Sequence, residues 1–69
     1  MRDIRANLDR ARWAEYAVEA FQEETRADDE DAVADLLCDL MHYCDATKQY
    51  FNEELTRALS HYAAETEGD

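Results

Sequence analysis

Apolar residues recur at helical spacing in three stretches of the chain. In the first stretch they stand three and four positions apart, at Ile4, Leu8, Ala11, Ala14, Val18 and Phe21. The same spacing returns in two later stretches, and it predicts helices over about 3–26, 30–46 and 53–66. Glycine occurs once and proline not at all, whereas turn-rich β architectures need both, so the composition also favours an all-α fold. We therefore expect an all-α, three-helix bundle with an up-down-up course.

The second and third helices each carry an apolar stripe that would face a shared core. In the second helix the stripe comprises Val33, Leu36, Leu37, Leu40, Met41 and Cys44. In the third it comprises Leu55, Ala58, Leu59, Tyr62 and Ala63. Asn52 is the expected N-cap of the third helix. At 69 residues the chain has room for a single domain, which we place at 1–66, followed by a frayed acidic tail at 67–69.

The first helix has a second apolar row beside the first, formed by Trp13, Tyr16, Ala17 and Ala20. Together the two rows are wider than one partner helix needs. Two helices of the same chain could cover this surface, or two copies of the chain could pair through the second row to form a homodimer. The sequence leaves both alternatives open.

Charge is distributed unevenly along the chain. The net charge is −11, yet residues 1–12 hold four arginines and two aspartates, a sum of +2. Residues 13–69 hold three basic and sixteen acidic residues, a sum of −13. Such a body repels nucleic acid and anionic membrane and attracts a cationic protein surface. It has no apolar run of about 20 residues and no signal-peptide core, so we expect a cytoplasmic protein.

The residues that carry metal or nucleophilic chemistry are few. Cys38 and Cys44 lie about 120° apart around a helix, so both thiols cannot bind one ion from it. We expect Cys44 in the core, Cys38 at its boundary and His42 in solvent. Ser60, the only serine, lies within a helix, and no glycine-rich phosphate loop exists. These patterns predict no enzyme, no metal site and no cofactor.

Two resemblances to known proteins add to this interpretation. The segment 31–45, with its DLMHYCD core, and the segments 51–55 and 57–62 are similar to a group of small acidic proteins of bacteria, phages and plasmids. That resemblance implies a mobile-element origin and no known activity. Asp35 and the helix 53–59 also resemble the latter half of MazG-type nucleotide pyrophosphohydrolases, which bind magnesium through paired acids. Ala32 and Gln22 stand where those pairs need acids, so both pairs are broken.

The acidic surface suggests a function by itself. Small acidic proteins of mobile elements often inhibit host defence proteins by occupying their DNA-binding surfaces, and we expect a similar role here. The candidate surface combines acids of all three helices: Glu15, Glu19, Glu23, Glu24, Asp28, Asp29, Glu30, Asp31, Asp35, Asp39, Glu53 and Glu54. The alternatives are a helical oligomerisation or scaffolding protein whose acids only keep it soluble, and, more remotely, the pyrophosphohydrolase.

Overall fold

The computed structural model describes residues 4–67 and consists of three helices. They are α1 (Ile4–Thr25), α2 (Asp29–Ala46) and α3 (Phe51–Thr66), and no strand occurs among the described residues. This confirms the all-α, three-helix prediction, with helix bounds within two residues of those expected. Of the tail predicted at 67–69, only Glu67 is described; residues 68 and 69, like residue 3 of the first helix, lie outside the described residues.

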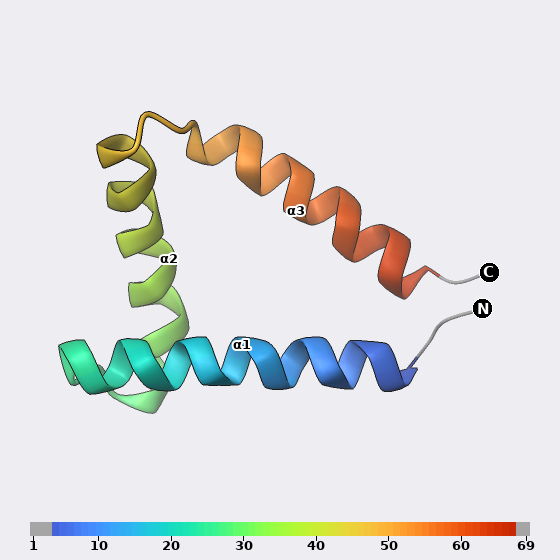
Figure 1. Ribbon diagram of the computed structural model, residues 1–69, viewed down its shortest axis with the longest axis horizontal. Helices are drawn as coiled ribbons and strands as arrows, with labels where there is room; N and C mark the ends of the chain where they lie inside the picture. Colours follow the sequence, from blue (N-terminus) through green and yellow to red (C-terminus); the bar gives the residue numbers. More distant parts are fainter. Residues whose placement is uncertain (1–3, 68–69) are drawn as a thin grey trace.

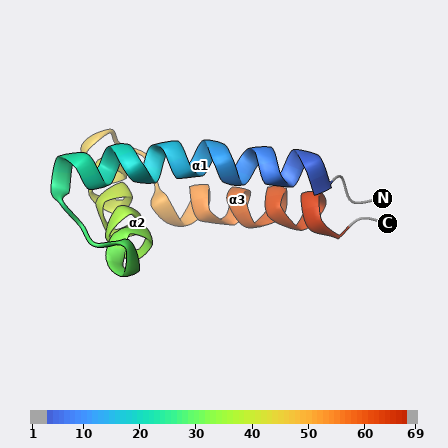
Figure 2. The same cartoon turned by 90° about the horizontal axis from the view of Figure 1, so that it is seen from below.

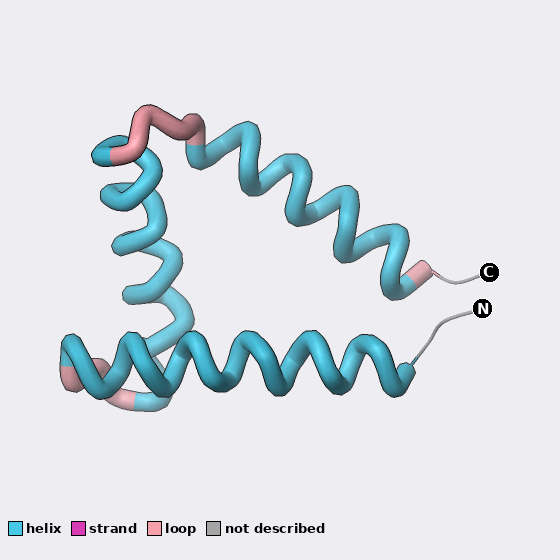
Figure 3. The backbone as a smooth tube through the Cα atoms, viewed as in Figure 1, coloured by secondary structure: helices cyan, strands magenta, loops and turns pink. Residues whose placement is uncertain are grey.

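The three helices form the sides of an open triangular frame. In Figure 1, α2 crosses α1 near its C-terminal end, and α3 runs back toward the N-terminal end of α1. The tube in Figure 3 shows that short loops make both corners of the frame. The frame is flat, with extents of 38 × 26 × 17 Å, and Figure 2 views it from its edge, with α1 and α3 lengthwise. Each helix therefore meets its neighbours near its ends.

Each interhelical loop contains a residue in the left-handed region near its start. Arg26 has a φ of 63°, and its N–H donates to the Gln22 carbonyl at 2.7 Å. Lys48 has a φ of 61°, while the Gln49 N–H donates to the Cys44 carbonyl at 2.8 Å. These bonds satisfy carbonyls that the helix ends leave open, in the αL and Schellman arrangements respectively. Each loop thus turns the chain sharply without glycine.

The starts of α2 and α3 differ in how well the sequence anticipated them. Asp28 is the N-cap of α2, and three acids follow in the first turn, where the helix dipole favours negative charge. The N-cap of α3 is Tyr50, so the prediction of Asn52 was wrong. The N–H groups of Glu53 and Glu54 donate to the Tyr50 carbonyl at 3.0 and 3.1 Å, which starts the helix two residues earlier.

The described residues bury very little. Ala32 is 1% exposed and Cys44 is 6% exposed, and they are the only buried residues among those whose burial is described, 5–67. The predicted core stripes of α2 and α3 are therefore wrong as a core, because their large side chains stay exposed: Val33, Leu37, Leu40, Met41, Leu55, Leu59 and Tyr62. The physical reason is the open frame, since helices that meet only near their ends cannot cover each other's apolar sides.

The third corner of the frame is closed by two polar contacts to one residue. The Asn7 Nδ2 donates to the Glu65 carbonyl at 3.2 Å. The Arg10 Nε lies 3.5 Å from the Glu65 carboxylate, with both side chains partly in solvent. These contacts join the start of α1 to the end of α3, across 58 residues of sequence.

Candidate functional site

The corner between α1 and α2 gathers acidic side chains from both helices. The Gln22 side-chain amide donates to the Asp29 carboxylate at 2.7 Å and to the Ala27 carbonyl at 3.2 Å. This bridge holds the start of α2 against α1. Asp29 then lines the same surface hollow as Glu15 and Glu19, and Glu23 lines the adjoining one. We call Glu15, Glu19, Glu23 and Asp29 the acidic corner.

No base neutralises the acidic corner within the described chain. The ion pairs among residues 4–67 lie elsewhere: Arg10 with Glu65, Arg12 with Asp9 at 3.9 Å, and Arg57 with Glu54 at 3.0 Å. All four carboxylates of the acidic corner are exposed. The corner therefore presents concentrated, solvent-facing negative charge.

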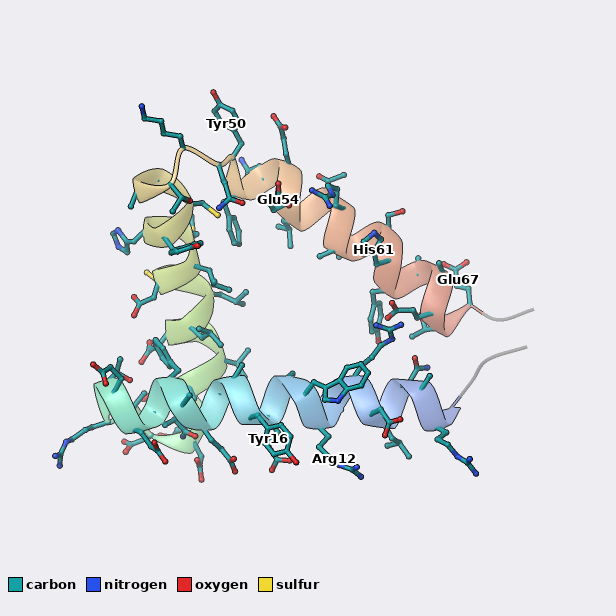
Figure 4. The ribbon with its side chains drawn as sticks, viewed as in Figure 1. Arg12, Tyr16, Tyr50, Glu54, His61 and Glu67 are labelled. Atoms are coloured by element: carbon teal, nitrogen blue, oxygen red, sulfur yellow. The ribbon has the colours of Figure 1, made fainter. Side chains whose placement is uncertain are left out.

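The remaining predicted acids divide into those near this corner and those far from it. Near it are the exposed Glu24 at the end of α1, Asp28 in the loop, and Glu30 and Asp31 in the first turn of α2; the exposed Asp35 and Asp39 follow farther along α2. Glu53 and Glu54 stand at the start of α3, beyond the far end of α2 (Figure 4). The length of α2 is about 27 Å at 1.5 Å per residue. The predicted acidic surface is thus not one continuous patch, and Glu54 is already paired with Arg57.

The second apolar row of α1 faces solvent. Trp13 and Tyr16 are each 61% exposed, and Ala17 and Ala20 are exposed as well. Figure 4 shows Tyr16 and Arg12 on the side of α1 away from α3. Of the two alternatives for covering the row, the one that uses helices of the same chain is therefore wrong.

Cys44 and His42 lie where the sequence placed them, whereas the prediction of Cys38 at the core boundary was wrong, because the open frame leaves that side chain uncovered. Cys44 is buried and unpaired, whereas Cys38 and His42 are exposed. Within residues 4–67, no three His, Cys, Asp or Glu side chains converge as a metal site requires.

Sequence reasoning missed the residues that shape the corners. Gln22 was unremarkable as a polar position on a helix, and no local pattern marks it, because its bond exists only where α2 crosses α1. Asn7 and Glu65 were missed for the same reason. Long-range contacts of single polar side chains leave no periodic signal.

Comparisons with known proteins found no relative of this chain. No family model matches the sequence, and no curated protein or solved structure is significantly similar to it. A membrane-crossing helix would have to be longer or more apolar than any helix in the described part of the chain. The acidic corner and the exposed row of α1 are therefore the features on which a function can be proposed.

Proposed function

We propose that the chain is a non-catalytic binding protein whose acidic surface docks on the basic surface of a nucleic-acid-binding protein. The observation that supports this is the acidic corner, where four exposed carboxylates from two helices lie together and none of them forms an ion pair within residues 4–67. Exposed, unpaired charge speeds the encounter with a surface of opposite sign and is repelled by nucleic acid itself.

Spacing explains why a corner serves this role better than one helix. Asp31, Asp35 and Asp39 recur every four residues, about 6 Å apart along α2. One strand of DNA places a charge about every 3.4 Å and the duplex about every 1.7 Å. A single stripe is too sparse to imitate either. Acids from α1 and α2 combined give a denser charge, which supports DNA-like mimicry at this corner.

The proposed setting is a cytoplasmic one in which a phage or plasmid protein inhibits a host defence protein. It rests on the resemblance to small acidic proteins of mobile elements together with the charge. Nucleic-acid binding by a defence protein needs a cationic groove, and an acidic protein seated there blocks it.

A scaffolding or oligomerisation role is the second candidate, and the exposed aromatic residues of α1 favour it.

The pyrophosphohydrolase alternative gains no support from the two positions at which its magnesium-binding pairs need acids. Ala32, which would need to be an acid, is the most buried residue described. Gln22, the other such position, is engaged with Asp29.

Charge removal at the acidic corner tests the proposal. Affinity capture from bacterial lysate at low salt should recover a basic nucleic-acid-binding protein, and that partner is then titrated in a salt series. The double variant Glu19→Gln, Glu23→Gln should weaken binding by about two- to thirtyfold, since each exposed pair is worth about 0.2–1 kcal/mol. It should also flatten the salt dependence.

The control is Asp45→Asn, Glu67→Gln, which makes the same charge change in the last turn of α2 and just after α3, away from the corner; Figure 4 labels Glu67. Affinity should then stay within about twofold of the unmodified protein. Equal losses in both double variants would show that only total charge matters. Failure to capture any basic nucleic-acid-binding protein would refute the proposal.

A further inference from the structure

The chain exposes more surface than a folded monomer of its size. Its accessible surface is 6050 Å², whereas a monomeric protein of 8.0 kDa exposes about 4,450 Å². The excess is about 1,600 Å² per chain, or about 3,200 Å² for two copies. Obligate homodimers bury about 2,000–5,000 Å² in total. The area left open here is what a stable dimer covers.

The exposed row of α1 has a shape that fits a second copy of itself. Its two large side chains, Trp13 and Tyr16, precede its two small ones, Ala17 and Ala20. In an antiparallel pair with a two-fold axis near residues 16 and 17, Trp13 lies over Ala20 of the other copy and Tyr16 over Ala17. A parallel pair would set ring against ring and leave alanine facing alanine. Interdigitation of large and small side chains favours the antiparallel pair.

The charges along α1 favour the same arrangement. Its first half carries the bases Arg5, Arg10 and Arg12 against one acid, Asp9, a sum of +2, and its second half carries only acids, Glu15, Glu19, Glu23 and Glu24, a sum of −4. Antiparallel pairing brings the basic half of each helix beside the acidic half of the other. Parallel pairing would place like charges together, at an energetic cost. Shape and charge thus select one orientation independently.

We propose that two copies of this chain form a symmetric dimer with their α1 helices antiparallel and Trp13 and Tyr16 at the centre of the interface. An interface of the size estimated above extends beyond the row of α1, and apolar side chains outside the row, such as Leu8, are also exposed on that helix. The dimer does not depend on the proposed binding function, because it forms from this protein alone.

Sedimentation equilibrium of the full chain, with no other protein present, tests the association. The unmodified protein should be a dimer at micromolar concentration. Trp13→Ala and Ala17→Arg should each raise the dissociation constant by about thirtyfold or more, as expected at the centre of an interface. Tyr50→Ala is the matched control, since Tyr50 is an exposed aromatic in the opposite corner of the frame (Figure 4) and should change nothing.

A distance measurement tests the orientation. A spin label at Leu8→Cys in a Cys38→Ser background leaves the buried Cys44 unlabelled. Antiparallel pairing about residues 16 and 17 separates the two labels by about 26 Å along the helix axis, at 1.5 Å per residue. Parallel pairing brings them to about the 8–10 Å spacing of packed helices. The longer distance supports the proposal and the shorter one overturns it.

Two further outcomes would overturn the dimer. A monomer at high micromolar concentration would show that no second copy covers the row. If Trp13→Ala and Ala17→Arg left the dissociation constant of the dimer unchanged, the interface would lie elsewhere. If a basic partner occupied the row in place of a second copy, the protein would be a monomer at high micromolar concentration. Trp13→Ala would then weaken capture of that partner.

Discussion

At the residue scale, small side chains are the ones that the fold buries. Ala32 and Cys44 are buried, whereas Trp13 and Tyr16, each far larger, are mostly in solvent. A small residue allows two backbones to approach closely, so it is covered even where helices touch over a short distance. Large side chains need neighbours on several sides, and an open frame does not provide them.

The two thiols should therefore react at different rates. Cys38 is exposed and Cys44 is buried, so one thiol per chain should react rapidly with an alkylating reagent and the second only as the chain unfolds. Mass spectrometry over a time course, with and without urea, gives the measurement. Cys38→Ser should lose the fast phase and Cys44→Ala the slow one. Two equally fast thiols would contradict the burial of Cys44.

At the element scale, the helix ends depart from the usual chemistry. A left-handed residue after a helix is most often glycine, because a Cβ costs about 1–2 kcal/mol in that conformation. Here arginine and lysine occupy both such positions. Two hydrogen bonds offset part of that cost: the Arg26 N–H donates to the Gln22 carbonyl at 2.7 Å, and the N–H of Gln49, which follows Lys48, donates to the Cys44 carbonyl at 2.8 Å.

Replacing Lys48 with glycine should stabilise the protein. Lys48→Gly removes the Cβ from the left-handed position, and we expect a gain of about 0.5–1 kcal/mol after the larger chain entropy of glycine is counted. Urea denaturation at one fixed protein concentration measures the free energy of unfolding. Lys48→Ala keeps the Cβ and should stay within about 0.5 kcal/mol of the unmodified protein. A lower free energy of unfolding for Lys48→Gly would show that the left-handed conformation of Lys48 does not destabilise the protein.

At the scale of the whole molecule, one residue closes the frame. The Glu65 carbonyl accepts a hydrogen bond from the Asn7 side chain, and the Glu65 carboxylate forms a largely exposed ion pair with Arg10. Contacts of this kind contribute little to stability but determine where helix ends lie. The frame has no interior core that would hold α3 against α1.

Breaking this closure should change the shape more than the stability. Asn7→Ala with Arg10→Ala should alter the free energy of unfolding by less than about 1–2 kcal/mol, the value of one hydrogen bond and one exposed ion pair. The distance between the start of α1 and the end of α3 should lengthen and broaden. Energy transfer between dyes placed on these two helix ends, in an excess of unlabelled protein, measures this distance.

Arg57→Ala serves as the control, because it removes an ion pair that lies within α3. That variant should leave the distance between the helix ends unchanged. An unchanged distance in the Asn7→Ala, Arg10→Ala variant would show that Glu65 does not close the frame.

Local features of the chain were predictable from the sequence. The spacing of apolar residues located all three helices, the acids from Asp28 to Asp31 marked the start of α2, and the burial of Cys44 and the exposure of His42 followed from their positions on one helix. Helical periodicity and capping act over a few residues, so they are written in neighbouring positions.

The tertiary structure alone decided how the helices meet. The apolar stripes of α2 and α3 indicated a packed core, but periodicity says which face is apolar and not whether another helix lies against it. The crossing of α2 over α1 set Asp29 beside Glu15 and Glu19, and the divergence of α3 left Leu59 in solvent. These results depend on the angles at two loops, where a left-handed arginine and lysine direct the chain. Contacts between distant residues leave no trace in local spacing, and for that reason they required the fold.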